Sequence, residues 1–342
     1  MKKRTRRRFR LPILIAVLLF GVGSNWYVHQ PPEWRGDMAR KLPSLLVAAI
    51  ESAGNASAEY TDNLGLTGRD VAIEKSPVAA STHFYGAPPQ ANSTNAPAQL
   101  IPLTKTGFSL AYSPAHRHPW WVAYMIAPVD SLATPPRPSR FSIDPAVKSP
   151  KHDDYTHSGY DRGHMAPNFA IASRFGAAAQ KETFLTSNIC PQRPDLNQGP
   201  WRDVEHRIAA IYAQRYPVWV IIGPLPPASP SDQIIDAKGK PTGISIPSGF
   251  YHIIISDHGG QLRVCAMIFP QNTPRNAHPR RYLASVREIE NLTGLNFFAD
   301  LSPADQDLLE LPTATRLWPT GLDGSWFVLK ERLKTRAKRQ NY

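Results

Sequence analysis

A short stretch of this chain, residues 160–205, gathers side chains that suit phosphodiester hydrolysis. In sequence order they are Arg162, His164, Asn188, Asn197 and Glu205. An imidazole can accept a proton from water near neutral pH, and a guanidinium matches the oxygens of a phosphate group. Carboxamide and carboxylate oxygens are the ligands that a hard cation such as Mg²⁺ prefers. Together these groups could supply a general base, a phosphate clamp and a metal site.

The apolar pattern after Pro200 predicts a helix over residues 201–212. Proline suits the first turn of a helix, and apolar side chains recur at helical spacing after it. Asn197 is then expected just before the helix, with Glu205 further along and leaning back toward it. A plainer alternative makes Asn197 only a helix cap and Glu205 a solvated helix residue, because asparagine is a favoured cap.

His164 also has a structural alternative, since a histidine between Gly163 and Met165 could be an ordinary core or loop residue. Its neighbours favour chemistry instead. Asp161 could orient or shield the imidazole, and Arg162 offers a planar fork for phosphate oxygens. Gly163 lets the backbone come close to a ligand.

Three motifs in a fixed order connect this stretch to a known family. They are Asp-Arg-Gly-His-Met-Ala-Pro-Asn at 161–168, Ser-Asn-Ile-Cys-Pro-Gln at 187–192, and Leu-Asn at 196–197 followed by Trp201 and Glu205. In this order the chain resembles the DNA/RNA non-specific endonuclease family, which has a ββα-metal (His-Me finger) core. Weaker similarity extends the resemblance over residues 82–300.

The resemblance implies a role for each motif residue. It makes His164 the general base that activates water, and Asn197 the direct protein ligand of one Mg²⁺ ion, for which Mn²⁺ is expected to substitute. It makes Glu205 the holder of metal-bound waters, Arg162 the clamp on the scissile phosphate, and Asn188 a supporting substrate contact. The implied activity is sugar-nonspecific hydrolysis of DNA and RNA to 5′-phosphate products, with little sequence preference.

Two positions depart from the family pattern. Ser187 stands where many members carry threonine, and the hydroxyl is retained. His252 stands where a lysine is expected, which puts in doubt a positive charge that other members carry. None of the core motif positions is lost, so a competent enzyme is expected.

The remaining pattern predicts an α+β fold, in which a mostly antiparallel sheet is flanked by helices and the ββα-metal finger forms the active site. Strands are expected over residues 107–112 and 120–126 as a hairpin, and over 184–189, 218–222, 249–256 and 262–269. Helices are expected over residues 170–182, 279–292 and 302–311.

The formal net charge of +12 lies at the two ends of the chain. Residues 1–10 contribute +7 and residues 330–342 contribute +5, so residues 11–329 are formally neutral. A basic groove for nucleic acid must therefore come from local arrangement. The apolar run 11–22 after the basic segment predicts an uncleaved membrane anchor, with a cleaved signal peptide and a basic cytosolic arm as alternatives.

With an anchor or a signal, the rest of the protein is expected outside the cytoplasm, in the inner membrane facing the periplasm or secreted. Four regions are expected: a signal anchor or signal peptide at 1–30, an extension and Pro-rich linker at 31–80, the endonuclease domain at 81–305, and a C-terminal extension with a basic tail at 306–342. Short helices are expected over 44–53 and 325–339, the second of them basic and amphipathic.

Several alternatives stay open at this level. Cys190 and Cys265 could form a disulfide or remain two buried thiols. The polar loop with His152, Asp153, Asp154 and His157 fits no established ligand spacing, so a metal site there is disfavoured. A nucleic-acid-binding surface protein that does not cut, and a phosphodiesterase for small molecules, are the competing functions. A homodimer is also left open by the resemblance.

Overall fold

The computed structural model describes residues 71–74, 83–258, 261–314 and 317. The chain divides into two compact units, and these residues all belong to the unit that runs from Gly68 to Trp318. The segment expected at 1–30 as an anchor or signal, and the helices expected over 44–53 and 325–339, lie outside the described residues.

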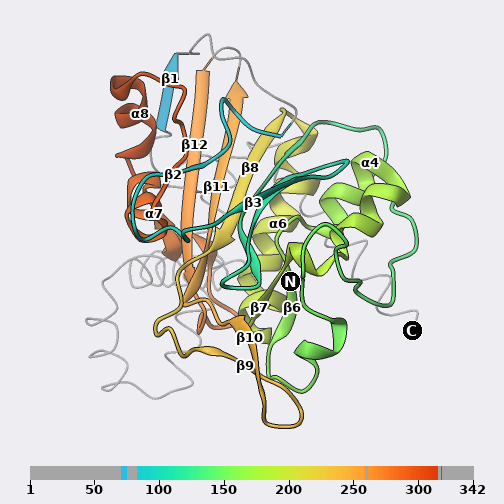
Figure 1. The fold of residues 1–342 in the computed structure, drawn as a ribbon. Coiled ribbons are helices and arrows are strands. Elements are labelled where there is room, and N and C mark those ends of the chain that lie inside the picture. Colours follow the sequence, from blue (N-terminus) through green and yellow to red (C-terminus); the bar gives the residue numbers. More distant parts are fainter. Residues whose placement is uncertain (1–70, 75–82, 259–260, 315–316, 318–342) are drawn as a thin grey trace, which may run out of the picture. The chain divides into compact units, whose positions relative to one another are not determined.

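A central antiparallel sheet organises the described unit (Figure 1). Across the sheet the strands follow the order β1 (Val71–Glu74), β12 (Gln261–Pro270), β11 (Gly249–His258), β8 (Val218–Pro224), β5 (His118–Ile126), β4 (Ser109–Ser113) and β3 (Ile101–Thr104). Each neighbouring pair is antiparallel. The short strand β13 (Leu283–Ala284) pairs with β12. With helices flanking the sheet, the predicted α+β class is confirmed.

The strand predictions are largely confirmed, because their runs of β-branched and aromatic residues fit a sheet that is buried on both faces. The predicted hairpin is formed by β4 and β5, and the three later strands are β8, β11 and β12. The strand predicted over 184–189 is wrong: a 3₁₀ turn, Thr186–Asn188, occupies most of it and β7 (Ile189–Gln192) starts only afterwards. Strand β1 lies in the stretch expected as an extension.

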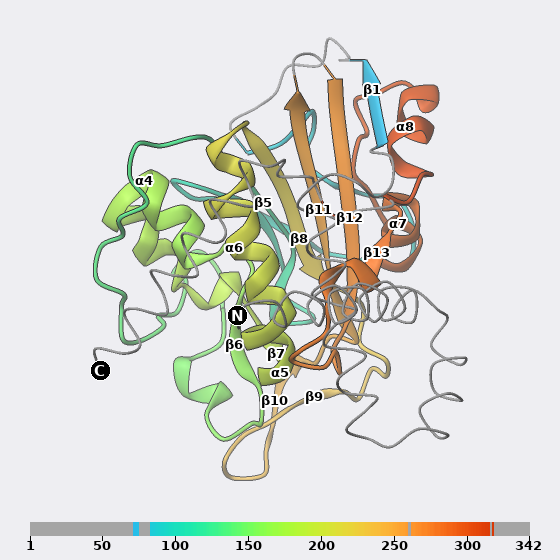
Figure 2. The ribbon, with the colours of Figure 1, turned by 180° about the vertical axis from the view of Figure 1, so that it is seen from behind.

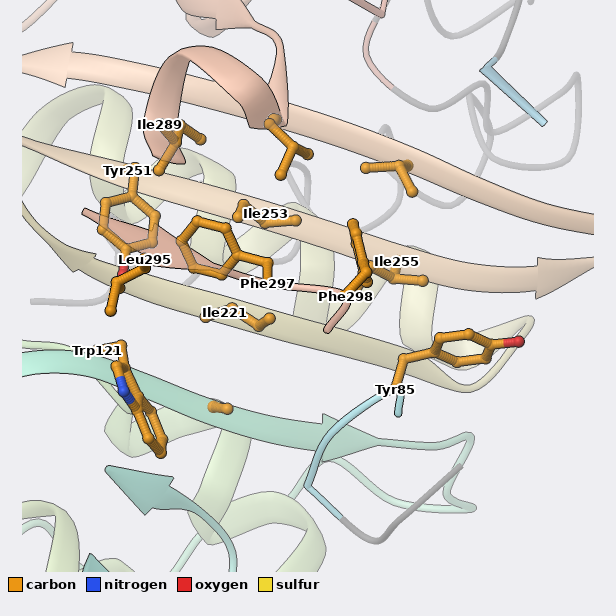
Figure 3. Packing of buried hydrophobic residues seen from close by; sticks show 14 of the residues in the cluster. Tyr85, Trp121, Ile221, Tyr251, Ile253, Ile255, Ile289, Leu295, Phe297 and Phe298 are labelled. Carbon is orange, nitrogen blue, oxygen red and sulfur yellow. The ribbon is translucent and has the colours of Figure 1, made fainter. Parts of the chain in front are cut away.

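One face of the sheet carries a hydrophobic core of aliphatic and aromatic side chains (Figure 3). Successive residues of a strand point to opposite faces, so Tyr251, Ile253 and Ile255 of β11 all face this core. Helix α7 (Val286–Thr293) contributes Ile289 to the same core, and α8 (Pro303–Glu310) contributes Leu309. This core fixes the sheet on which the rest of the unit is built.

The alternate residues of β11 face the opposite way. Phe250 and His252 are buried beneath Trp201, whose ring centroid lies 5.5 Å and 4.0 Å from theirs. Helices α4 (Asn168–Thr183) and α6 (Arg202–Ala210) lie side by side, away from α7 and α8 (Figures 1 and 2). The tryptophan therefore seats the start of α6 on the sheet.

Two of the helix predictions agree with the structure, and a third places the start of its helix wrongly. Helix α4 confirms the prediction for 170–182, with a kink at Gly176, whose φ is +77°. Helix α8 confirms the prediction for 302–311. The start of the predicted helix 279–292 is wrong, because residues 279–284 form a 3₁₀ turn and strand β13 before α7 begins. A capping box between Ser285 and Glu288 sets that start.

Three smaller strand pairs complete the described unit. They are β6 (Asp161–His164) with β7, β9 (Gln233–Ile235) with β10 (Pro241–Ser245), and β2 (Gln90–Ala91) with β14 (Leu295–Asn296). Cys190 and Cys265 are both buried free thiols, which settles the alternative left open by the sequence. Among the residues that can be described, no helix has the length and apolar character needed to cross a bilayer.

Candidate active site

A two-stranded ribbon and a helix build the candidate site. Strand β6 pairs antiparallel with β7, so that Gly163 faces Cys190 and His164 faces Ile189. A side chain at position 163 would collide with Gln192, which explains why a glycine precedes the histidine. After the ribbon, the chain turns through α5 (Pro194–Leu196) into α6 (Figure 2). This arrangement of two strands and a helix matches the predicted ββα finger.

A cavity of about 360 Å³ opens between the ribbon, the first turn of α4 and the first two turns of α6. Four of the five predicted site residues line it: Arg162, His164, Asn197 and Glu205. Residues far apart in the sequence thus meet at one concave surface. Asn188 is the predicted site residue that does not line the cavity.

His164 contributes a neutral imidazole to the cavity. Its ring packs against Phe184, edge-on at 4.9 Å between centroids, and against Phe141 at 5.2 Å. Burial lowers the pKa of His164 to about 3, and the positive charge of Arg137 adds to the effect. Its Nε2 atom is buried and has no hydrogen-bond partner within the described part of the chain. An uncharged ring with an unpartnered nitrogen is the form that a general base requires.

Asn197 is oriented by a neighbouring carboxylate. Its Nδ2 donates to Oδ2 of Asp161 at 2.8 Å, and Nε2 of Gln198 donates to the same oxygen at 2.8 Å. An ionised carboxylate only accepts hydrogen bonds, so the nitrogen of the Asn197 amide must face it and the oxygen must face elsewhere. Asp161 therefore serves the asparagine, whereas the sequence suggested a role beside His164.

The backbone around Asn197 is helical, unlike the prediction. Helical geometry starts at Pro194, and Asn197 itself lies in it with φ −59° and ψ −44°. A π-helical turn, Asn197–Trp201, then leads into α6. The prediction that Asn197 lies just before the helix, and its alternative as a helix N-cap, are both wrong, because Pro194 already supplies the first-turn proline.

The π-helical turn is kinked at Gly199, whose ψ is −119°. A Cβ atom there would lie 2.5 Å from the backbone oxygen of Arg275, so only glycine fits against that loop. The guanidinium of Arg275 also donates to Asp195 and to Gln198, each at 3.1 Å. The loop around Arg275 thus holds the segment that carries Asn197.

Glu205 points a buried carboxyl group at the cavity. Its Oε1 atom has no hydrogen-bond partner among the residues that the structure describes. Burial raises the pKa of Glu205 to about 8, although the charges of Arg137 and Arg202 oppose the rise. A carboxyl group in this environment is stabilised as a carboxylate by a cation or by hydrogen-bond donors brought by a ligand.

Arg162 is held at the edge of the cavity by hydrogen bonds to the loop that precedes its strand. Its Nε and Nη2 atoms donate to the carbonyl of His152 at 3.1 Å and 2.8 Å, and Nη2 also donates to the hydroxyl of Thr156 at 2.9 Å. These bonds fix the plane of the guanidinium. A planar cation fixed in this way can meet a phosphate without a large loss of side-chain entropy.

Asn188 supports the loop after the histidine from behind. Its Oδ1 accepts from the Ala166 amide at 2.8 Å, and its Nδ2 donates to the carbonyls of Ala166 and Thr183, each at 3.0 Å. The side chain is fully buried. These bonds engage both ends of the carboxamide in positioning the turn between His164 and α4, so the substrate contact expected of Asn188 is wrong: the side chain is buried behind the loop and bonded to the backbone.

The structure shows what the side chains contact at the two positions that depart from the family pattern, Ser187 and His252. Ser187 uses its hydroxyl to donate to buried Asp144 at 2.6 Å, and Asp144 also pairs with Lys105 at 2.8 Å. His252 is buried, and burial lowers its pKa to about 3, so it carries no charge at neutral pH. The positive charge that the family pattern places at position 252 is therefore missing here. The His252 ring packs against Trp201 instead.

The polar loop near His152 is engaged in local structure. The Nδ1 atom of His152 accepts from the Phe141 amide at 3.2 Å, and Asp154 accepts from the Lys151 amide at 2.8 Å. Asp153 meets Arg140 at 3.3 Å. No group of three metal-ligating His, Cys, Asp or Glu side chains occurs within residues 71–74, 83–258, 261–314 and 317.

The cavity has further lining residues with polar or aromatic side chains that were not predicted as site residues. Among them are Arg137, Phe169, Arg202 and His206. Positions 198, 202 and 206 are four apart, so helical spacing could have placed Arg202 and His206 on the face that carries Gln198. Arg137 comes from the irregular segment 127–140, and the sequence holds no signal that brings it to the cavity.

The fold and the cavity together define a protein with a ββα finger, whose histidine lies on the ribbon and whose amide and carboxyl oxygens lie on the helical segment that follows. The chain belongs to the DNA/RNA non-specific endonuclease family, whose model matches residues 86–304. The predicted family is therefore confirmed.

Individual relatives agree with this assignment. The chain is 31% identical over 235 residues to "Nuclease EXOG, mitochondrial" of Xenopus laevis, and the match covers 60% of this chain and 64% of that relative, less than two thirds of its length. It is 28% identical over 286 residues to "Endonuclease G, mitochondrial" of Bos taurus, and the match covers 78% of this chain and 94% of that relative. A crystal structure of an EndoG/EndoGI complex shares the fold, with a TM-score of 0.51 at 23% identity over 60% of this chain and 89% of that one.

Proposed function

We propose that this protein is a magnesium-dependent endonuclease that hydrolyses phosphodiester bonds in DNA and RNA and leaves 5′-phosphate products. The observation that carries the proposal is the cavity that joins the unpartnered Nε2 of His164 to Asn197 and Glu205. The family and its nuclease relatives support the same activity.

The chain's own residues divide the work of hydrolysis. His164, neutral because it is buried, accepts the proton of the attacking water. Arg162 binds the scissile phosphate through the part of its guanidinium that is not bonded to His152 and Thr156. Arg137 and Arg202 add positive charge around the same cavity. This local charge occurs although residues 11–329, taken together, are formally neutral.

The donor set fits a hard cation such as Mg²⁺ or Mn²⁺. Asn197 offers its amide oxygen because Asp161 takes the nitrogen, and Glu205 offers a buried oxygen that lacks a partner in the described residues. Asn197 would hold the ion directly and Glu205 would hold its waters. When bound, the ion supplies charge neutralisation at the phosphate and at the leaving 3′-oxygen.

A plasmid-cleavage assay tests this proposal against its two competitors. The wild-type chain should nick and linearise plasmid and degrade RNA with Mg²⁺, and EDTA should stop both reactions. His164→Ala should remove nearly all activity, with partial recovery on adding imidazole, because a general base contributes typically about 10²- to 10⁴-fold. Binding of plasmid without cleavage would support a capture protein. Cleavage of a chromogenic diester alone would support a small-molecule phosphodiesterase.

Location and assembly complete the proposal. Anchoring of the chain through residues 1–30, with the catalytic unit on the noncytoplasmic side, rests on the basic and apolar segments at the start of the sequence. The homodimer stays a prediction.

A further inference from the structure

An aromatic pair lies in the wall of the catalytic cavity. Phe169 stands in the first turn of α4 and His206 in the second turn of α6, and both line the cavity together with His164 and Glu205. Their ring centroids are 6.1 Å apart and their planes are inclined by only 14°. Two helices thus present nearly parallel rings beside the groups assigned to hydrolysis.

Phe169 is less buried than the residues that follow it in α4. The next three residues of α4, Ala170–Ala172, are buried against the unit, whereas Phe169 is half-buried and His206 is exposed. The other side chains of the cavity are mostly cationic or amide groups. A large aromatic ring gains most when apolar surface covers it, and the exposed part of the Phe169 ring is open to such a contact from a ligand in the cavity.

We propose that Phe169 and His206 form a stacking subsite for a nucleobase next to the scissile phosphate. This inference rests on the proposed function and deepens it, because it assigns residues to the base as well as to the phosphate. The arginines hold the backbone, and the rings hold the face of a base.

Stacking suits an enzyme without sequence or sugar preference. Every base has a π-face, so a ring that stacks on it gains affinity without reading the base edge. The 2′-hydroxyl of RNA is not involved in such a contact, so DNA and RNA are held alike. The subsite therefore accounts for binding energy that does not depend on the sequence of the substrate.

The same geometry gives single strands an advantage. A base inside a duplex is already stacked on its neighbours, and it must leave them before it can stack on Phe169. Unstacking a base costs less free energy in a single strand than in a duplex. The subsite should hence raise the cleavage of single-stranded DNA and RNA more than the cleavage of duplex DNA.

The test uses the full chain and a single-stranded oligonucleotide with one cleavable linkage, all other linkages being methylphosphonates. In matched versions, the nucleotide on either side of that linkage carries thymine or is abasic. We expect Phe169→Ala to lower kcat/KM on the thymine substrate by roughly 5- to 150-fold, mainly through KM, because stacking on one aromatic side chain is worth that much. On the substrate that is abasic at the stacked position, the variant and the wild type should be equal.

Two further variants separate stacking from other effects. Phe175→Ala is the matched control, because Phe175 is another partly exposed phenylalanine of α4, at 36% exposure, and lies outside the cavity lining. It should leave kcat/KM unchanged on both substrates. His206→Phe keeps a ring and should retain most of the activity, whereas His206→Ala should lose activity on the thymine substrate only.

Equal losses for Phe169→Ala on thymine and abasic substrates would overturn the inference, because Phe169 would then shape the cavity without touching a base. No loss on either substrate would overturn it as well. A wild-type chain that cleaves neither substrate, nor plasmid, would instead refute the proposed function. The two failures are therefore distinguishable in one set of reactions.

Discussion

The side-chain amide of Asn197 donates a 2.8 Å hydrogen bond to the carboxylate of Asp161, across the gap between β6 and the helical turn. Asp161 is the first residue of the motif that also carries His164, so one strand carries the proposed base and orients the proposed metal ligand. The bond leaves the Asn197 oxygen as the group that can bind a cation.

The first prediction follows from this bond. Asn197→Ala should raise the magnesium concentration needed for half-maximal cleavage by about 10-fold or more, because a direct ligand is lost. Asp161→Asn should raise it by roughly 10- to 100-fold, the range typical of residues that orient a metal ligand. A magnesium titration of plasmid cleavage at fixed pH and salt measures both effects.

Asp203→Asn is the control for that titration, because Asp203 is an exposed residue of α6 that lies outside the cavity lining. Its curve should superimpose on that of the wild type. If the curve of Asn197→Ala also superimposed on it, the metal ligand would have to be another residue.

The second prediction concerns the buried carboxyl of Glu205. Glu205→Gln keeps the shape of the side chain but removes the charge that would hold metal-bound waters, so cleavage should fall by roughly 10- to 100-fold. Asp203→Asn removes an exposed charge from the same helix and should change little. Steady-state cleavage rates at saturating magnesium compare the two variants. Equal rates for Glu205→Gln and the wild type would remove Glu205 from the mechanism.

The third prediction concerns a buried pair of carboxyl groups between α7 and α8. The side chains of Glu290 and Glu310 are 5% and 0% exposed, and both lie at Arg287, at 3.5 Å and 2.7 Å. Asp307 also meets Arg287, at 2.9 Å. Burial, with the nearby charge of Glu290, raises the pKa of Glu310 to about 7 from an ordinary value of 4.5.

Between pH 4.5 and about pH 7, the Glu310 carboxyl keeps its proton in the folded state but has lost it in the unfolded state. The contribution of this pair to the free energy of unfolding should therefore be largest below pH 4.5. It should decrease as the pH rises to about 7. We expect a loss of about 1 to 3 kcal/mol over this window. Urea unfolding of Glu310→Gln should lack this decrease, whereas the exposed control Asp300→Asn should retain it. A wild-type profile without the decrease would contradict the prediction.

The fourth prediction concerns location. The catalytic unit should fractionate with the cell envelope and face the noncytoplasmic side, because seven cationic residues precede the apolar run 11–22. Protease added to spheroplasts should digest it, while a cytoplasmic marker protein stays intact. Protection of the catalytic unit until the cells are lysed would argue against this location.

The chemistry of the site could be predicted from the sequence because it depends on residue types in a fixed order. His164, Asn197 and Glu205 were identified from their motifs, and the cavity brings all three together. The main strands were also predictable, since period-two and continuous apolar patterns report burial in a sheet directly. Helix α8 was similarly evident from the serine and proline at its start.

Other features were decided only by tertiary contacts. The kink at Gly199, just after Asn197, lies where the backbone of Arg275 approaches it from a distant part of the sequence. Arg137 reaches the cavity from an irregular segment. The state of His164 was equally hidden, because its lowered pKa is caused by burial and by the charge of Arg137. A sequence specifies which groups a chain carries, but solvent exclusion and charge proximity exist only once the segments are packed together.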